Sequence, residues 1–576
     1  MIASKPSPRQ WCWTESLGLA LTLLILPAMG CSPSSQPAPP QPKGGSPTQT
    51  RPAGNDVLEL VFPYGSEKQK WIDAVTKEFN DGDHRTAAKN RIWVRTVPLG
   101  SGELITEIQE GRLKGHLASP ASSVFIELGN AESKTRTGKP LVGETRNLVV
   151  SPVVVAMWKP MAEALGWGKR PIGWADILQI AKDEQGWAKY NYPQWGRFKF
   201  GHTHPEYSNS GIISVFAEVY AGAGKLKGLT AADVARPEVG QFLHGIEESV
   251  VHYGSSTGFF GRRMFLGGPQ YLSAAVLYEN MVIESYGSDP APPLPVVAIY
   301  PKEGTFWSDH PVGVVQREWV DDEHRQAAEE YIAFLTAPEQ QKRAMEFGFR
   351  PADVGIPLGD PINAAHGVDP KQPETTLEVP SATVMNAVVD LWKQQKKHAN
   401  VVLAIDISGS MQGKKIDNAK IGAKQLVEIL DKGDTLSLMS FNDNVAWAGQ
   451  GLSMATDRQV AAQDIDSLFA SDGTALYEAI AMAHRYLVAK PASDKISAIV
   501  VLSDGEDTSS RMRLEELLKL VETNVEGRGV RIFTIGYGSD ARPDVLGKIS
   551  EVTQAKYYSG TPENIREVFK EISTFF

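Results

Sequence analysis

Acidic and hydroxyl side chains recur in three short stretches of the last third of the chain. Asp406, Ser408 and Ser410 occupy alternate positions directly after an apolar run. This alternation aims a carboxylate and two hydroxyls at one point as the chain leaves a strand. Thr474 and Asp504 lie in two later loops that also adjoin apolar stretches. Because Mg²⁺ takes such oxygens as ligands in proteins, these residues are candidate cation ligands. A capped turn is the alternative for the first three.

The elements that must position these residues follow from the hydrophobic pattern of residues 398–576. Short apolar runs alternate with longer segments whose apolar residues recur three and four positions apart, which predicts strands alternating with helices. The expected strands are Val401–Ile405, Leu436–Phe441, Ile496–Leu502 and Arg531–Ile535, and the expected helices include Ile416–Leu430 and Ala475–Leu487. This order predicts a doubly wound α/β fold with a parallel sheet between helices. Ligands of such sheets bind outside the carboxyl ends of the strands, where the three loops would meet.

The run Asp406-Ile407-Ser408-Gly409-Ser410, with the distant Thr474 and Asp504, resembles the metal-ion-dependent adhesion site of von Willebrand factor type A domains. The resemblance implies a Rossmann-like fold for residues 398–576 and a bound Mg²⁺, or Mn²⁺ or Ca²⁺. It also implies that Ser408, Ser410 and Thr474 bind the ion directly, while Asp406 and Asp504 act largely through water. An ion with so few charges around it would seek a carboxylate from an unknown partner protein.

The amino terminus has the features of an export signal. Lys5 and Arg9 precede the apolar run Leu17–Leu26, which is too short to span a bilayer. The run leads to Ala28-Met29-Gly30-Cys31, which resembles the lipobox of bacterial lipoproteins. The resemblance implies that residues 1–30 are a cleaved signal peptide and that Cys31 is diacylated. A plain secretory signal is the alternative.

Residues 31–55 are expected to be a disordered tether. They are rich in Pro, Ser, Gln and Gly and hold almost no large apolar residues, as flexible spacers do. The chain has 2 cysteines, and because Cys12 lies inside the signal, the mature chain would have no internal disulfide. We therefore expect an extracytoplasmic protein that is anchored to the bacterial cell membrane by a lipid on Cys31.

Residues 56–355 also alternate strand-like and helix-like segments, which predicts another α/β domain. The patterns His-Pro-x-x-Ser-x-Ser-Gly (204–211) and Tyr-Pro-Lys-Glu-Gly (300–304) are similar to those of bacterial extracellular solute-binding proteins of the two-lobed periplasmic type, close to the molybdate- and sulfate-binding group. The resemblance implies two lobes that close on a ligand. Crossover strands between the lobes are expected at Leu148–Met157 and Ala275–Ile283. Residues 356–397 are expected to be a linker with a connector helix.

Residues at predicted helix starts are the candidate solute ligands of this domain. Free backbone amides and the positive end of a helix dipole favour an anion there. The candidates are Ser208, Asn209, Ser210 and Gly211 on one lobe, and Ser66 and Ser101 on the other. Simple helix capping is the alternative for each. His202 and His204 could form a metal pair, but no third ligand is evident in the sequence, which favours structural roles.

Composition limits the functions that are open to the chain. Its 576 residues exceed the size of one hydrophobic core, and its formal net charge of −10 argues against a nucleic-acid partner. No convincing pair of nucleophile and base is found, so no catalytic residue is assigned. We expect a non-enzymatic, surface-anchored protein that joins a solute-binding-like domain to a metal-dependent protein-binding domain. The alternatives are a receptor that brings a small anionic solute to an ABC transporter, and a hydrolase with a metal centre at His202 and His204.

Overall fold

A computed structural model gives the structure of the chain. It describes residues 52, 54, 56–490, 495–522, 529–538, 541–562 and 564–576. The predicted signal peptide, Cys31 and all of the predicted tether except residues 52 and 54 lie outside the described residues. Within the described ranges, no helix has the length and apolar character needed to cross a membrane.

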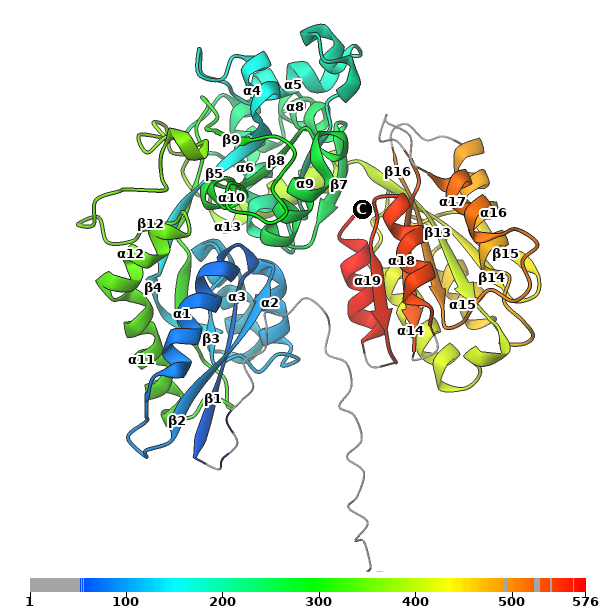
Figure 1. The fold of residues 1–576 in the computed structure, drawn as a ribbon, viewed down its shortest axis with the longest axis horizontal. Helices are drawn as coiled ribbons and strands as arrows, with labels where there is room; N and C mark the ends of the chain where they lie inside the picture. The colour runs from blue at the N-terminus through cyan, green and yellow to red at the C-terminus, as the bar shows by residue number, and fades with distance from the viewer. Residues whose placement is uncertain are drawn as a thin grey trace, which may run out of the picture. The chain divides into compact units, whose positions relative to one another are not determined.

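The first lobe is built on two small sheets (Figure 1). Strand β1 (Val57–Gly65) pairs in parallel with β2 (Arg91–Leu99). Strand β11 (Pro311–Val315) pairs antiparallel with β3 (Leu117–Ala118) and β4 (Val142–Asn147). The helices of this lobe are η1 (Ser66–Lys68), α1 (Gln69–Asp81), α2 (Ser101–Gln109), α3 (Ser123–Thr137), α11 (Asp322–Thr336) and α12 (Pro338–Glu346).

The second lobe surrounds a mixed sheet in the order β10-β5-β8-β6-β7, with β9 and β12 also paired to β5. Its strands are β5 (Val149–Trp158), β6 (Phe200–Thr203), β7 (Val250–Gly254), β8 (Ala274–Tyr278), β9 (Val296–Ile299), β10 (Trp307–Ser308) and β12 (Arg350–Pro351). Its helices are α4 (Lys159–Leu165), α5 (Trp174–Lys182), η2 (Gly186–Tyr190), η3 (Pro193–Trp195), α6 (Asn209–Ala223), α7 (Ala231–Val234), α8 (Pro237–Glu247), α9 (Thr257–Tyr271) and α10 (Glu279–Ser285).

The chain crosses between the lobes three times, from β4 to β5, from β10 to β11 and from α12 to β12, and the sequence predicted one of these crossings. It leaves the first lobe at β4 and enters the sheet of the second lobe at β5, close to the expected crossover Leu148–Met157. The other expected crossover, Ala275–Ile283, is wrong. That segment forms β8, which pairs with β5 and β6 inside the second lobe, and then α10. The chain returns at β10 and β11 instead, because a short apolar run looks the same in a central strand and in a crossover.

The predicted connector helix belongs to the second lobe. Helix α13 (Ala382–Gln395) follows Ser381, as expected from the sequence. Its buried residues, among them Val388 and Trp392, pack against α6, α7 and α8. The preceding segment contains the short helix η4 (Ala364–His366).

Residues from 398 onward form the α/β fold that the sequence predicted. The sheet order is β15-β14-β13-β16-β17-β18, and all neighbours are parallel except β15 and β14. The strands are β13 (His398–Asp406), β14 (Thr435–Phe441), β15 (Val445–Ser453), β16 (Lys495–Ser503), β17 (Arg531–Tyr537) and β18 (Tyr557–Gly560). The helices are η5 (Gly409–Met411), α14 (Lys414–Ile429), α15 (Arg458–Asp466), α16 (Leu476–Ala489), α17 (Leu514–Val521), α18 (Pro543–Val552) and α19 (Ile565–Ser573).

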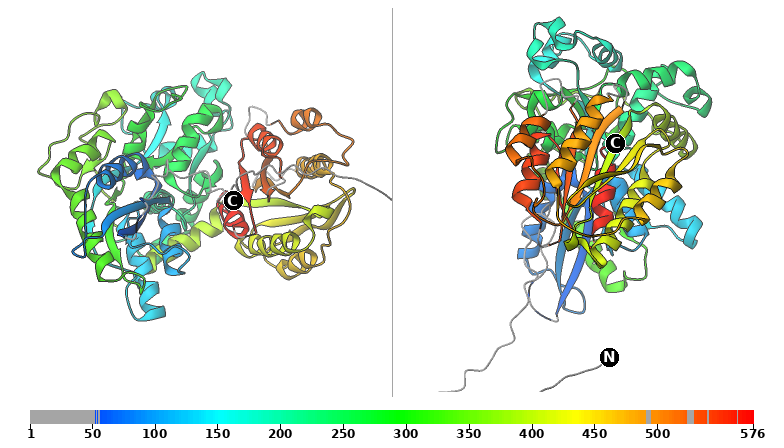
Figure 2. Two further views of the ribbon diagram at one scale, coloured as in Figure 1. Left: turned by 60° about the horizontal axis from the view of Figure 1, so that its bottom comes forward. Right: turned by 90° about the vertical axis from the view of Figure 1, so that its right-hand side faces the viewer.

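Helices cover both faces of this sheet, as Figures 1 and 2 show. The central strand β13 is buried on both sides, which explains its continuous apolar run. Val401, Leu403 and Ile405 pack in the same core as α14, whereas Val402 and Ala404 pack in the core that contains α16. This alternation fixes the strand in register, so that its last residue, an aspartate, lies where the loops leave the sheet.

Candidate functional site

Two predicted cation ligands lie where neighbouring parallel strands end. Asp406 is the last residue of β13, and Asp504 directly follows Ser503, the last residue of β16. Ile405 pairs with Leu502 in the register of these two strands. The fold therefore brings both carboxylates to the same edge of the sheet, where ligands of such sheets bind.

Hydrogen bonds join the loops that carry these residues. Ser408 N donates to Asp406 Oδ1 (2.8 Å), and Ser503 Oγ donates to Asp406 Oδ2 (2.6 Å). Ser410 Oγ donates to Asp504 Oδ1 (2.7 Å) and lies 3.0 Å from Ser408 Oγ. The structure thus places the two carboxylates and the two serine hydroxyls in one cluster of oxygen atoms.

Thr474 lies in a neighbouring loop that contacts the same segment. Gly409 N, between the two serines, donates to Asp472 O (2.9 Å). Thr474 itself is fixed from the other side, since its amide donates to Thr508 Oγ1 (2.9 Å) and its carbonyl accepts from Thr508 N (2.9 Å). Thr474 is buried, and these backbone bonds fix its position in the loop.

Lys415 also belongs to this cluster, although the sequence patterns did not indicate it. Its Nζ, in the first turn of α14, contacts Asp504 Oδ2. The carboxylate of Asp504 is fully buried, whereas the side chain of Lys415 is partly exposed. The ammonium group therefore neutralises a buried carboxylate and would compete with a bound cation for the same oxygen.

Burial controls the electrostatics of Asp406. Desolvation raises the pKa of Asp406 to about 6, the Asp504 carboxylate adds to this effect, and hydrogen bonds from Ser503 and Ser408 oppose it. Two buried carboxylates close together are costly unless a positive charge compensates them. Carboxylates and hydroxyls are also the donor set that fits the octahedral oxygen coordination of Mg²⁺. The residues present therefore fit a divalent cation.

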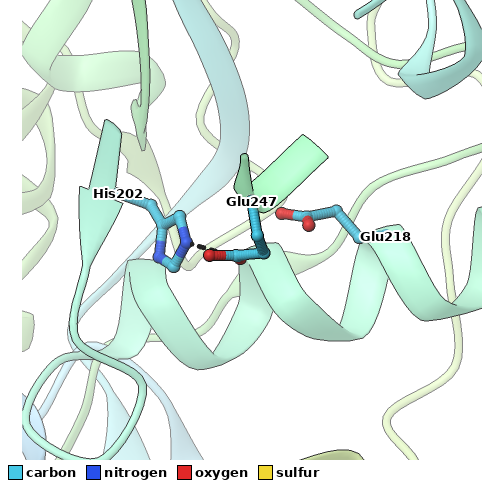
Figure 3. A group of neighbouring side chains, drawn as sticks. All are labelled: His202, Glu218 and Glu247. Carbon is cyan, nitrogen blue, oxygen red and sulfur yellow. Dashed lines mark hydrogen bonds and ion pairs between the residues drawn. The ribbon is translucent and has the colours of Figure 1, made fainter. Parts of the chain in front are cut away.

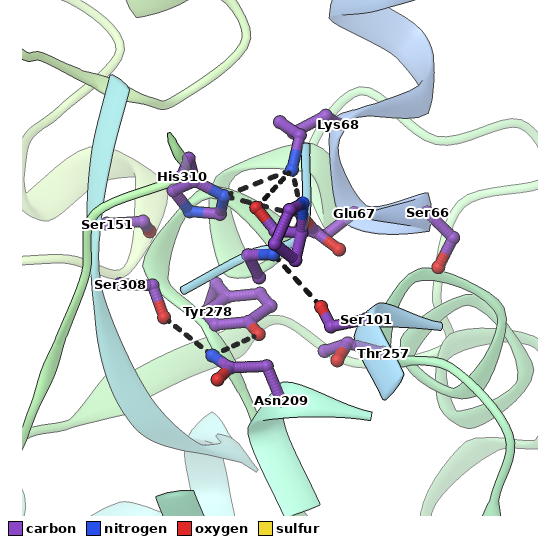
Figure 4. A network of polar contacts seen from close by, with 12 residues as sticks. Ser66, Glu67, Lys68, Ser101, Ser151, Asn209, Thr257, Tyr278, Ser308 and His310 are labelled. Atoms are coloured by element: carbon purple, nitrogen blue, oxygen red, sulfur yellow. Dashed lines mark hydrogen bonds and ion pairs between the residues drawn. The ribbon is translucent and has the colours of Figure 1, made fainter. Parts of the chain in front are cut away.

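Three of the candidate solute ligands, Ser66, Ser101 and Asn209, lie near one another in Figure 4, although they come from both lobes. Ser66, at the start of η1 in the first lobe, donates from Oγ to Ser256 Oγ (2.9 Å) and accepts from Gly258 N (3.0 Å) at the start of α9 in the second lobe. Ser208 Oγ lies 3.1 Å from Thr257 Oγ1 in the same helix start. These loops face each other across the lobes as the sequence predicted.

Asn209, the first residue of α6, is the candidate with an unused polar atom. Its Nδ2 donates to Tyr278 OH (2.9 Å) and to Ser308 Oγ (2.9 Å). Among the residues that the structure describes, its Oδ1 has no hydrogen-bond partner, although the side chain is fully buried. Such an orphaned buried atom is the kind of group that a solute would satisfy.

The remaining candidates contact the protein itself. Ser101 Oγ accepts from Ala121 N (2.9 Å) within the first lobe. Ser210 Oγ accepts from Thr257 Oγ1 (2.9 Å) and lies 2.8 Å from Thr203 Oγ1. A Cβ added to Gly211 would lie 2.0 Å from Thr203 O, so glycine permits α6 to approach β6 closely. Close packing accounts for the glycine at position 211. Hydrogen bonds within the protein account for the hydroxyl groups of Ser101 and Ser210, whether or not a solute also binds there.

A buried charged network in the same region was missed by sequence reasoning. Lys68 Nζ donates to Glu67 Oε1 (2.8 Å), and His310 Nδ1 lies 3.4 Å from both of these atoms. Burial alone would raise the pKa of Glu67, but Lys68 and His310 outweigh it and lower this pKa to about 2. Burial lowers the pKa of Lys68 and of His310. Lys68 and His310 are 242 residues apart, and no local pattern links them.

His202 and His204 do not share a site. The ring of His204 packs edge-on against Trp392 of α13, with ring centroids 4.9 Å apart, and burial lowers its pKa well below the usual value. The ring of His202 instead contacts Glu247. The structural role predicted from the sequence suits His204, whereas His202 has a carboxylate neighbour that the sequence did not reveal.

Two family models match different parts of the chain. Residues 64–350 match the bacterial extracellular solute-binding protein family. Residues 400–571 match the von Willebrand factor type A domain. The chain therefore contains an extracellular solute-binding domain followed by a type A domain, as the two sequence resemblances indicated.

Parts of the chain are also similar to individual proteins. The inter-alpha-trypsin inhibitor heavy chain H2 of Mesocricetus auratus is 29% identical over 189 residues, which cover 30% of this chain and 20% of that protein, so the match spans about a fifth of that relative. A solved structure, von Willebrand factor type A from Catenulispora acidiphila, is 24% identical over 31% of this chain and 42% of that chain, with a TM-score of 0.28. The periplasmic binding protein P5PA is 14% identical over 59% of this chain and 99% of that chain, with a TM-score of 0.39.

Proposed function

We propose that this chain, which joins an extracellular solute-binding domain to a von Willebrand factor type A domain, is an extracytoplasmic binding protein that captures a partner protein through a divalent cation. The observation that carries the proposal is the cluster of carboxylates and hydroxyls at the ends of β13 and β16, with Ser410 Oγ 2.7 Å from Asp504 Oδ1. Both kinds of domain are typical of binding proteins, so no catalytic step is assigned.

The cation would be held by Asp406, Ser408, Ser410, Thr474 and Asp504. When bound, Mg²⁺ or Mn²⁺ supplies an electrophilic centre that accepts a carboxylate oxygen from the partner. The chain's own residues orient the site: Ser503 and the amide of Ser408 hold Asp406, and Thr508 fixes the backbone of Thr474. Because hydroxyls contribute no charge, the ion keeps enough positive charge to attract an acidic group.

Membrane attachment would come from the amino terminus. A lipid on Cys31 and the Pro- and Ser-rich segment after it would hold the two domains away from the membrane surface. Extracytoplasmic location agrees with the family of the solute-binding domain. The lipid itself remains our proposal, because Cys31 lies outside the described residues.

A second function, delivery of a small solute to an ABC transporter, is favoured by the region between the lobes. Asn209 Oδ1 and His310 Nε2 are buried there, and neither has a hydrogen-bond partner within the described ranges. The ammonium of Lys68 is close by but is paired with Glu67, so its positive charge is largely compensated. A small anion with hydrogen-bonding groups is the class of solute that we propose for this function.

Calorimetric titration with Mg²⁺ and Mn²⁺ tests the leading proposal. A soluble form that lacks residues 1–31 should bind one ion per chain at the type A site, and Asp406→Ala should abolish that binding. Glu506→Ala is the matched control, because Glu506 lies in the same loop as Asp504 but is exposed and paired with Arg542. Equal binding by the chain and by Asp406→Ala would refute the proposed site.

A further inference from the structure

Three ionisable side chains meet inside the second lobe. His202 lies on β6, Glu218 in the middle of α6 and Glu247 at the end of α8. One nitrogen or oxygen atom of each lies within 4.8 Å of the others, and all three side chains are fully buried. Figure 3 shows the Glu247 carboxylate turned toward the His202 imidazole, and the Glu218 carboxylate directed toward Glu247 from the other side.

Two of these residues are held in place by neighbours and are also paired with each other. His202 Nε2 lies 3.0 Å from Glu247 Oε1, and its other ring nitrogen, Nδ1, lies 2.8 Å from Thr203 O. Glu247 Oε2 accepts from Tyr253 OH (2.7 Å). A histidine whose Nδ1–H binds a backbone carbonyl presents the lone pair of Nε2 inward, which is the usual orientation of a metal-binding histidine.

The third residue, Glu218, lacks the partners that a buried carboxylate needs. Its Oε1 accepts from Ser214 Oγ (2.7 Å), one turn earlier in α6. Its Oε2 makes no hydrogen bond to any residue in the described parts of the chain. Helix α6 is buried on all sides from Asn209 to Tyr220, so water cannot solvate this oxygen from an exposed face. An unpaired buried carboxylate is costly, and a cation at this point would compensate it.

We propose that His202, Glu218 and Glu247 bind a divalent transition-metal ion of the zinc type inside the second lobe. Ligand atoms of a tetrahedral zinc ion lie about 3.3 Å apart, given zinc–ligand distances of ~2.0 Å. His202 Nε2 and Glu247 Oε1 are already 3.0 Å apart, and a carboxylate oxygen of Glu218 lies within 4.8 Å of both, so a shift of its side chain would complete the set. The imidazole favours zinc over magnesium, because magnesium prefers oxygen ligands.

Charge balance supports the same assignment. In the deprotonated state that binds a metal ion, two carboxylates and a neutral imidazole carry two negative charges, which one divalent ion cancels. Tyr253 and the Thr203 carbonyl then remain as hydrogen-bond partners that orient Glu247 and His202. The ion would join β6, α6 and α8, so its role would be to stabilise the second lobe.

Metal content provides the first test, on the full chain without its signal. The protein is refolded from denaturant with and without Zn²⁺, dialysed and analysed by mass spectrometry of the metal. We expect one zinc ion per chain only after refolding with Zn²⁺, together with a raised melting temperature. Because the cluster is buried, a chelator should remove this zinc from unfolded protein but only slowly from folded protein. Absence of zinc after refolding would overturn the proposal.

Substitutions of the proposed ligands test where the zinc ion binds. His202→Gln and Glu218→Gln should each weaken zinc binding by about 100-fold or more, since each removes a ligand. His204→Gln is the matched control, because it replaces a second buried histidine of the same strand region that lies outside the cluster. Asp406→Ala should keep the zinc, which separates this site from the type A site.

Cobalt provides an independent readout if a variant folds poorly. Co²⁺ bound by one nitrogen and two carboxylates in a tetrahedral site absorbs visible light, which can be followed in the unaltered protein. We expect this absorption after refolding with Co²⁺, and expect added Zn²⁺ to remove it. Zinc retained equally by Glu218→Gln, or no cobalt absorption in the unaltered protein, would contradict the assignment.

Discussion

Ser410 Oγ donates a 2.7 Å hydrogen bond to Asp504 Oδ1, although the two residues are 94 positions apart in the sequence. The other oxygen of the same carboxylate contacts Lys415 Nζ. Asp504 thus has both a hydroxyl and an ammonium group as neighbours, and a metal ion would have to share it with them. The affinity of the cation site should therefore depend on a lysine that is not itself a ligand.

Removing the ammonium of Lys415 should strengthen cation binding. Lys415→Ala removes the competitor for Asp504, and a partly exposed ion pair is worth ~1 kcal/mol or less, so the gain in Mn²⁺ affinity should be about fivefold. Titration calorimetry of the soluble chain measures it. Lys414→Ala, which removes the same charge from the preceding exposed position, should leave the affinity nearly unchanged. Weaker binding by Lys415→Ala would show that the lysine supports the site instead of competing.

Thr474 should contribute through its hydroxyl group. Thr474→Ala keeps the backbone bonds to Thr508, so the domain should stay folded while Mn²⁺ affinity falls by at least about tenfold. Thr474→Ser retains the hydroxyl and should bind nearly as well as the unaltered chain. Circular dichroism confirms folding in both variants. Equal affinity of the alanine and serine variants would remove Thr474 from the set of ligands.

Local patterns predicted the type A fold correctly because each signal lies within a few residues, whereas cation binding at the candidate site stays a prediction. The apolar run Val401–Ile405 became the core of β13, and the alternate positions of Asp406, Ser408 and Ser410 put their side chains in one loop. Parallel strands buried on both faces are long apolar runs in sequence, so their ends, and the loops after them, are easy to place.

Contacts between distant segments were not predictable in the same way. The pairing of Lys68 with His310 joins positions 242 residues apart, and neither residue lies in a pattern that indicates the other. The apolar run of β8 was wrongly predicted to be a crossover strand. Central strands and crossover strands are both buried, so both have apolar sequences, and this run had no other feature that distinguishes them. The hydroxyl of Ser210, predicted to bind solute, has Thr203 and Thr257 as partners in the structure.

Acid should destabilise the chain partly through Glu67. Its pKa is about 2 in the folded protein and 4.5 when unperturbed, so its ionised form stabilises the fold above pH 4.5. This contribution, on the order of 3 kcal/mol at neutral pH, should be lost as the pH falls through 2. Denaturant unfolding between pH 5 and 2 should therefore show a shallower decline in stability for Glu67→Gln than for the unaltered chain.

A surface glutamate gives the control for this pH dependence. Glu59 on β1 pairs with Arg95 at a partly exposed position, so Glu59→Gln should keep the acid dependence of the unaltered chain. His310 also has a lowered pKa, because it is buried and close to Lys68, and adds a further loss of stability below pH 6.5 in all of these proteins. Identical slopes for Glu67→Gln and the unaltered chain below pH 4.5 would contradict the prediction.

Membrane attachment should depend on the sulfur atom of Cys31, which we propose carries the lipid. In a bacterial host that processes lipoproteins, the full chain should partition into the detergent phase, and Cys31→Ser should move it to the aqueous phase. Cys12→Ser is the control, since Cys12 lies within the predicted signal and would be removed. Aqueous behaviour of the unaltered protein would eliminate the lipid anchor.

A small solute should stabilise the region between the lobes through Asn209. A ligand at 100 times its dissociation constant stabilises the folded state by ~2.7 kcal/mol, which raises the melting temperature measurably. The screen should contain molybdate, sulfate, phosphate, small carboxylates, sugars and peptides, and we expect a shift with a small anion. Asn209→Ala should remove that shift, because it deletes the amide whose Oδ1 lacks a partner within the described residues.

The matched control for this screen is another buried asparagine, whose side chain bonds to the backbone of the first lobe. Asn80 Nδ2 donates to Val94 O (2.9 Å) and its Oδ1 accepts from Val94 N (2.8 Å). Asn80→Ala should lower the melting temperature but keep the ligand-induced shift, since these bonds join α1 to β2 within the first lobe. No shift with any compound would mean that the domain has kept the two-lobed fold without binding these solutes, and that its surface serves protein contacts instead.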